Sequence, residues 1–189
     1  MYDIDYNHMN PEDILRKYYN PETRAFYIIM QHSSVVTKKA LKIAQGVKHL
    51  HPDSSFIHEA AMLHDIGMFL TRAPQIGCYG NCPYICHGYL GREILEKEGL
   101  SEHALVCERH VGVGITVRDI EEKSLPLPIR DMIPITIEEQ IICYADKFFS
   151  KVSGSLIEER PLKSVRKTIE GYGTDKLERF DEWAENFGY

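Results

Sequence analysis

Residues 60–67 read AAMLHDIG and place His64 and Asp65 late in a strongly apolar helical segment. Asp is a poor helix former, and its negative charge near a helix C-terminus opposes the helix dipole. A cation bound beside this pair would offset both costs. The dipeptide alone leaves a second interpretation open, which is an ordinary surface pair at the end of a helix.

Helical signals continue on both sides of this stretch. Asn10-Pro11 and Asn20-Pro21 each combine a cap residue with proline at the first helical position, and an apolar stripe at helical spacing runs on from Val35. No alternating β-branched run is long enough to predict a sheet. We therefore predict an all-α fold, with helices near residues 11–19, 21–50, 54–68, 87–98, 101–111, 138–152, 161–170 and 174–187.

Two stretches interrupt the helical pattern and are predicted to be long loops. Residues 71–85 contain two prolines and two glycines, and residues 121–136 contain three prolines. Cys78, Cys82 and Cys86 lie in or beside the first stretch at regular spacing. They could form an added metal site, but a loop with three reduced thiols is favoured because no matching second pair accompanies them.

Size and composition limit the class of protein. A chain of 189 residues with 43% hydrophobic and 26% charged residues fits one globular domain. A net charge of −6 argues against non-specific nucleic-acid binding, which needs clustered Lys and Arg. No apolar run is long enough to span a membrane, and the acidic start of the chain does not resemble a secretion signal. With an odd number of cysteines, these features predict a cytoplasmic protein with reduced thiols.

Two further residues favour the interpretation that the His64-Asp65 pair binds a metal ion. His32 lies at the head of an apolar helical segment, and Asp146 interrupts the apolar face of another. A lone buried carboxylate is costly unless it is paired or bound to a metal. Imidazole and carboxylate donors together suit Zn, Mn or Fe rather than Ca. A core histidine at position 32 and an interhelical salt bridge at Asp146 remain open as alternatives.

His87 and His110 raise the question of a second metal ion. Each lies at the end of a predicted helix beside a glycine, one at the start and one at the finish. Together they could complete a second metal position. Taken singly, each could equally be a capping or surface histidine.

In this order, these residues resemble the HD superfamily of metal-dependent phosphohydrolases, whose pattern is H…HD…D with two added histidines in the dinuclear members. The local matches are LHDIG at 63–67, ERH at 108–110 and YADK at 144–147. The resemblance is to small stand-alone HDIG-type proteins. It implies an HD-domain helical bundle with a core at about 28–152, inside a single domain that takes in residues 1–189.

The resemblance also implies the ligand set. His32, His64, Asp65 and Asp146 would hold one divalent metal ion. If two ions bind, Asp65 would bridge them and be the central catalytic residue, and His87 and His110 would hold the second. Fe, Mn, Zn, Ni and Mg all remain open as the metal.

The implied activity is hydrolysis of a phosphoester or phosphoanhydride bond in a small phosphorylated substrate, by resemblance a nucleotide. Arg109 and Lys147 adjoin ligands and are candidates for binding phosphate, and the loop 71–85 is expected to form a wall of the pocket. A homodimer is left open. Many HD proteins have Lys where this chain has Met68, and this departure supports an alternative function: a metal-bound ligand sensor or interaction module without turnover.

Overall fold

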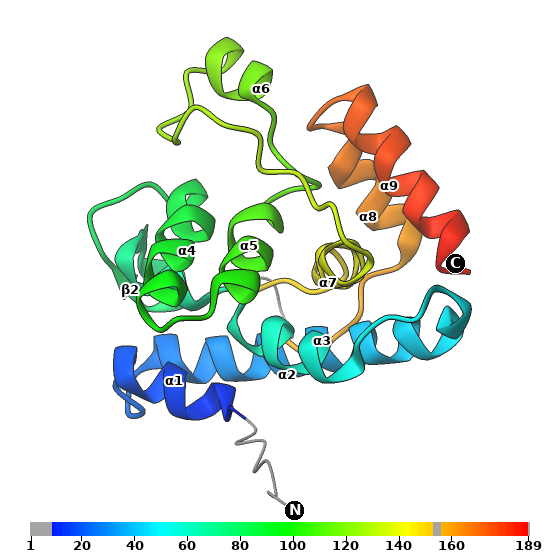
Figure 1. The fold of residues 1–189 in the computed structure, drawn as a ribbon. Helices are drawn as coiled ribbons and strands as arrows, with labels where there is room; N and C mark the ends of the chain where they lie inside the picture. Colours follow the sequence, from blue (N-terminus) through cyan, green and yellow to red (C-terminus); the bar gives the residue numbers. More distant parts are fainter. Residues whose placement is uncertain (1–8, 153–155, 189) are drawn as a thin grey trace, which may run out of the picture.

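The computed structural model describes residues 9–152 and 156–188, which form helices stacked on one long helix (Figure 1). The α-helices are α1 (Pro11–Tyr18), α2 (Arg24–Gly46), α3 (Ser54–Leu63), α4 (His87–Lys97), α5 (Ser101–Arg109), α6 (Val117–Glu122), α7 (Ile137–Asp146), α8 (Leu162–Glu170) and α9 (Thr174–Asn186). Short 3-10 helices are η1 (Lys48–Leu50), η2 (Ile66–Leu70), η3 (Pro74–Ile76) and η4 (Tyr84–Cys86). In the described part of the chain the one sheet is the antiparallel pair β1 (Arg72–Ala73) and β2 (Cys78–Tyr79). The predicted all-α fold is confirmed.

Side-chain caps begin several of these helices. The prediction at Asn20-Pro21 was wrong, because α2 begins at Arg24 with Thr23 as its cap, whereas the caps predicted for α1 and α3 are confirmed. Asn10 accepts a hydrogen bond from the amide of Glu12, and Pro11 takes the first helical position of α1. Asp53 accepts from the amides of Ser55 and Phe56 at the start of α3. These caps fix where the helices start and therefore which residues face the core.

The long helix α2 joins two separate apolar clusters. Its first half, with Ile28 and Ile29, packs into a cluster with residues of α1, η2, α4 and α5. Its second half, from Val36 onward, packs with α3, α7, α8 and α9. His32 lies on α2 between the two clusters and is fully buried. A buried polar side chain therefore lies between the two apolar clusters.

Three predicted helices end at least four residues earlier than expected. The helix predicted over 21–50 ends at Gly46, the one over 54–68 ends at Leu63 and is followed by η2, and the one over 138–152 ends at Asp146. The backbone of Asp65 leaves the helical region at φ −105° and ψ 10°. Apolar periodicity continues across such a change, so it cannot locate the end of a helix.

The predicted loops hold short regular elements. β1 and β2 form a small hairpin within 71–85, and α6, which was not predicted, ends two residues inside the second predicted loop. Thr116 and Asp119 form a capping box at the start of α6. Glycines before this helix and prolines after it made the sequence read as irregular, so the helix was not predicted. Figure 1 shows α6 apart from the other helices, at the end of two long connections.

Within the described residues, no helix combines the length and apolar character needed to cross a bilayer.

Candidate metal centre

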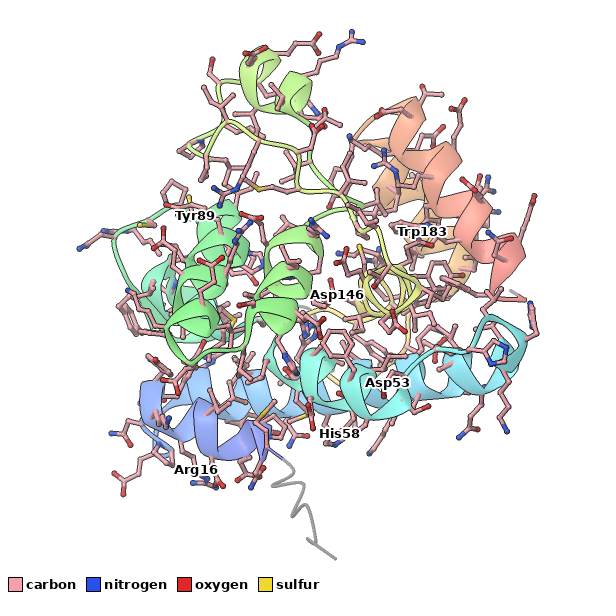
Figure 2. The ribbon with its side chains drawn as sticks, viewed as in Figure 1. Arg16, Asp53, His58, Tyr89, Asp146 and Trp183 are labelled. Atoms are coloured by element: carbon pink, nitrogen blue, oxygen red, sulfur yellow. The ribbon has the colours of Figure 1, made fainter. Side chains whose placement is uncertain are left out.

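Six polar side chains from distant parts of the chain meet at the boundary between the two apolar clusters. They are His32 within α2, His64 directly after α3, Asp65 directly before η2, His87 at the start of α4, His110 directly after α5 and Asp146 at the end of α7. Asp146 lies near the middle of the molecule in Figure 2. The C-terminal ends of α3, α5 and α7 carry partial negative charge, which favours a cation at this point.

Close backbone packing brings the second pair of histidines to Asp65. A Cβ atom at Gly67 would overlap the carbonyl oxygen of His87 and the backbone of Gly91. A Cβ atom at Gly91 would in turn overlap the sulfur of Cys107 in α5. The absence of side chains at these two glycines lets η2, α4 and α5 approach one another closely. His87 and His110 are thereby placed beside the His-Asp motif.

Three of the histidines have their ring orientation fixed by the backbone. The Nδ1 atom of each lies 2.6–2.7 Å from the carbonyl oxygen of the residue three positions earlier, in the pairs His64–Ala61, His87–Tyr84 and His110–Cys107. A carbonyl oxygen only accepts hydrogen bonds, so each Nδ1 atom carries the proton. The Nε2 atoms are left for another partner, which is the arrangement that metal-binding histidines use. Nε2 of His87 and of His110 offers a lone pair, since burial lowers the pKa of both rings. Burial opposes protonation of His64 as well, but Asp65 and Asp146 raise its pKa to about 9, so a metal ion would displace a proton there.

The two carboxylate oxygens of Asp65 face different histidines. Oδ2 lies 3.4 Å from His32 Nε2 and 3.2 Å from His64 Nε2. Oδ1 lies 3.3 Å from His87 Nε2 and 3.5 Å from His110 Nε2. Asp65 is therefore placed between two pairs of imidazoles, as a carboxylate that bridges two ions would be.

These separations match those between ligands of one metal ion. Two ligands at about 2.1 Å from an ion, at angles of roughly 90–110°, lie about 3.0–3.4 Å apart. His87 Nε2 and His110 Nε2 lie 3.1 Å apart, within this range, while the 2.8 Å between His32 Nε2 and Asp146 Oδ1 is the length of a direct hydrogen bond. Two overlapping groups have ligand atoms within 4.8 Å of one another: His32, His64 and Asp146, and His64, Asp65 and His110.

Several buried atoms of this cluster lack hydrogen bonds within the described residues, among them His64 Nε2 and Asp65 Oδ1. Buried polar atoms are rarely left without a partner, because desolvation is costly. A divalent ion would satisfy them, and the donor set of imidazole and carboxylate suits Fe, Mn or Zn. The side chains present therefore fit a divalent metal ion.

Ammonium groups keep the buried carboxylates ionised in the metal-free protein. Burial opposes ionisation of Asp65, but Lys151 and His64 hold the pKa of its carboxyl well below the ordinary value. Burial likewise opposes ionisation of Asp146, while Lys147 and Lys151 lower its pKa. Both aspartates are thus negative at neutral pH and available to a metal ion.

Lys151 is a member of this cluster that sequence analysis missed. Its Nζ atom lies 2.7 Å from Asp65 Oδ2 and 4.0 Å from Asp146 Oδ1. Tyr84, which stacks on the ring of His87, also contacts Lys151. The sequence pattern does not single out Lys151, because it predicts a helix through residue 152. The helix ends five residues before Lys151, at Asp146. Met68, at the position where many HD proteins have Lys, is buried in the apolar core instead.

The two residues predicted to bind substrate have different surroundings. The Lys147 ammonium lies 2.7 Å from Asp146 Oδ2 and donates to the carbonyl oxygen of His110. The structure does not bring Arg109 to the cluster: its guanidinium donates to Glu139, 2.7 Å away. Arg109 thereby holds the start of α7 against the end of α5. Cys78, Cys82 and Cys86 belong to no potential metal-binding group of the described residues.

A cavity of about 440 Å³ opens onto the cluster. It is lined by five residues of the cluster, His87, His110, Asp146, Lys147 and Lys151. The rest of its lining includes Asp119 in α6, Lys123 directly after α6, Tyr172 between α8 and α9, and Lys176 in α9. From the loop predicted over 71–85, only Tyr84 and Ile85 reach this cavity.

Residues 29–150 match the HD domain family. The chain belongs to the HD domain family. The match covers the whole ligand series, from His32 to Asp146, and ends one residue before Lys151. HD domains bind divalent metals, which agrees with the fit of this cluster to a metal ion.

Curated relatives share the HD domain at moderate identity. The chain is 36% identical over 121 residues to an uncharacterised protein of Methanocaldococcus jannaschii, covering 62% of this chain and 64% of the relative. It is 34% identical over 124 residues to a tRNA (cytidine(56)-2'-O)-methyltransferase of Picrophilus torridus, covering 65% of this chain and 32% of that enzyme.

A methyltransferase of the same name from Thermoplasma volcanium is 31% identical over 139 residues, covering 73% of this chain and 35% of the enzyme. The matched part of this chain thus spans just under two thirds of the length of the first relative and about a third of the length of each methyltransferase. No solved structure matches it.

Proposed function

We propose that this HD domain is a metal-dependent phosphohydrolase that cleaves a phosphoester or phosphoanhydride bond in a small, nucleotide-like substrate. The observation that carries the proposal is that the cavity opens directly on the candidate metal ligands. His87, His110 and Asp146 belong both to the cluster and to the cavity wall. A substrate in the cavity would therefore lie beside the metal site.

Two ions are proposed, with Asp65 as the bridging ligand. His32, His64 and Asp146 would hold the first ion together with Asp65 Oδ2, and His87 and His110 would hold the second together with Oδ1. Bound divalent ions supply hydroxide at neutral pH and neutralise phosphoryl charge. The chain's part is to orient the three imidazoles by their Nδ1 hydrogen bonds and to exclude bulk water by burial.

The charge of the cavity supports an anionic substrate. Its lining contains four lysines, at positions 123, 147, 151 and 176, but only two aspartates, at 119 and 146. The whole chain has a net charge of −6. A positive hollow in an acidic protein concentrates anions at that point, so the cavity suits a phosphorylated compound.

The apolar part of the cavity lining supports a substrate with an apolar or aromatic body. It includes Ile85, Val113, Ile115, Leu125 and Tyr172. Aromatic and aliphatic walls suit the face of a nucleobase. The volume of about 440 Å³ lies in the range of small-ligand sites, roughly 300–1,000 Å³.

The test is hydrolysis by protein loaded separately with Mn²⁺, Fe²⁺, Zn²⁺, Ni²⁺ or Mg²⁺. The panel contains nucleoside mono-, di- and triphosphates, dinucleoside polyphosphates and simple phosphate monoesters. We expect hydrolysis of one nucleotide class, measured by chromatography of the nucleotide products and by release of orthophosphate where a terminal phosphoryl group is cleaved, and loss of that hydrolysis in Asp65→Asn. Tight binding of a nucleotide without turnover under every metal would instead support the ligand-sensor alternative.

Because two relatives are named as tRNA methyltransferases, tRNA is added to the panel of tested substrates. Those names describe proteins about three times as long as the matched segment, so the methyltransferase activity is not proposed for this chain. Full-length tRNA is included as a potential substrate with terminal phosphates. The acidic composition makes a small nucleotide the expected substrate.

A further inference from the structure

We propose that Lys151 holds the place of a metal ion in the metal-free protein and changes partner to a phosphoryl group when metal binds, so that metal binding and anion binding strengthen each other. This inference rests on the metal site of the proposed function. It assigns a role to a residue that lies outside both the family match and the ligand series.

The position of the ammonium is the first observation. Lys151 Nζ lies 2.7 Å from Asp65 Oδ2, the same oxygen that faces His32 and His64. It also lies 4.0 Å from Asp146 Oδ1. An ammonium and a divalent ion on the same small set of oxygens repel each other strongly at low dielectric. A metal ion in the first position therefore disfavours this placement of Lys151.

Charge balance in the buried cluster is the second observation. Without metal, the carboxylates of Asp65 and Asp146 face the ammonium groups of Lys147 and Lys151 and the protonated ring of His64, whose pKa they raise to about 9. A divalent ion that replaces the His64 proton adds one net positive charge that no group of the cluster offsets, and buried unpaired charge is costly. An anion in the cavity, or outward movement of Lys151, would restore the balance.

The third observation is that Lys151 has somewhere to move. Its side chain lines the cavity and is 12% exposed, and it lies in the bend that follows α7 rather than inside a helix. The space beside it is where the substrate's phosphoryl group would lie in the proposed function. An ammonium released from Asp65 is therefore already placed to contact that group, as a point charge suited to phosphate.

The experiment is calorimetric titration of chelator-treated protein with Mn²⁺, with and without inorganic phosphate, for the wild type and Lys151→Met. In the wild type we expect phosphate to raise Mn²⁺ affinity about tenfold, within the usual range of coupling between sites. In Lys151→Met we expect Mn²⁺ affinity without phosphate to rise about tenfold, because the competing ammonium is gone, and the phosphate effect to shrink toward unity.

The matched control is Lys39→Met, the same substitution at a similarly buried lysine. The Lys39 ammonium pairs with Glu159 and lies over the Phe148 ring, so we expect wild-type Mn²⁺ affinity and phosphate coupling. Unchanged or weaker Mn²⁺ binding in Lys151→Met, or an undiminished phosphate effect, would overturn the inference while leaving the phosphohydrolase proposal standing. Failure of the wild type to bind any divalent metal would overturn both.

A second measurement uses the wild type and does not depend on the folding of a variant. Brief acetylation of lysine amines, followed by peptide mass spectrometry, reports how accessible Lys151 is. Mn²⁺ alone should raise acetylation of Lys151 several-fold by releasing it from Asp65, and added phosphate should reverse the increase. Equal labelling in all three states would contradict the proposed change of partner.

Discussion

The Nε2 atoms of His87 and His110 lie 3.1 Å apart, and neither ring can donate a proton to the other while both are neutral. Each ring already donates its Nδ1 proton to a backbone carbonyl. Burial lowers the pKa of both histidines, for His87 to about 3. At neutral pH two lone pairs therefore face each other, an arrangement that a cation between them would stabilise.

The first prediction concerns the number of metal ions. His87→Ala and His110→Ala should each reduce the metal content from two ions to one per chain, since each removes a ligand of the second position. Elemental analysis of protein purified without chelator measures this. His103→Ala is the matched control: that buried histidine pairs with Glu59 outside the cluster and should leave two ions. One ion per chain in the wild type would refute the dinuclear arrangement.

The second prediction concerns Asp65. Asp65→Ala should lose both ions and all hydrolysis, because both histidine pairs face this one carboxylate. Asp53→Ala removes an aspartate from the other end of α3, where it caps the helix. That control should cost about 1 kcal/mol of stability and keep its metal. Metal content and urea denaturation of the two variants separate these outcomes, and full metal retention in Asp65→Ala would contradict the prediction.

The third prediction concerns Asp119 in the cavity lining and pH. Burial opposes ionisation of Asp119, but hydrogen bonds from Lys176 and Thr116 lower the pKa of its carboxyl below the ordinary value. A carboxyl with a lowered folded-state pKa stabilises the protein above its unfolded pKa of about 3.9, and this contribution is lost as pH falls further.

We therefore expect Asp119→Asn to be about 2 kcal/mol less stable than the wild type, equally at pH 7 and pH 5. Below about pH 4 the difference should shrink. Chemical denaturation across this range measures it. Asp175→Asn removes a mostly exposed partner of the same lysine and should change stability little. A difference that grows on acidification would contradict the assignment.

The fourth prediction concerns close packing at the His-Asp motif. A methyl group at Gly67 would collide with backbone atoms of α4 that cannot move aside, so Gly67→Ala should destabilise the protein by about 1–3 kcal/mol and weaken metal binding. Gly46→Ala is the control, since nothing lies within 4 Å of the added methyl at the end of α2. Gly46→Ala should be neutral or stabilising by up to about 1 kcal/mol. Equal thermal stabilities of the two variants would count against the packing argument.

The sequence allowed prediction of the helical fold and of the six side chains that the structure brings together. The ligand positions were readable because polar residues such as Asp146 and His32 stand out on apolar helical segments, where burial is costly without a partner. The number of ions and the role of each ligand stay predictions until metal is measured.

Lys151 could not be predicted, and the reason is geometric. In an unbroken helix, a residue five positions after Asp146 would point about 140° away from it. Because α7 ends at Asp146, the chain turns and returns Lys151 to the site. Arg109 illustrates the opposite case, since proximity to His110 in sequence suggested phosphate binding, while its side chain points to Glu139.

The wall of the cavity has a small apolar cluster of its own. Ile115, Ile120 and Met132 form it, separate from the two large clusters that carry the candidate ligands. Arg130 fastens this wall to the buried carboxylate of Glu108 on α5. Substitutions in residues 115–132 can therefore reshape the cavity without displacing His64, Asp65 or the helices that hold them. In the proposed hydrolase, the reaction and the choice of substrate would therefore depend on different parts of the chain, and substitutions in this wall would change the substrate while the chemistry stays the same.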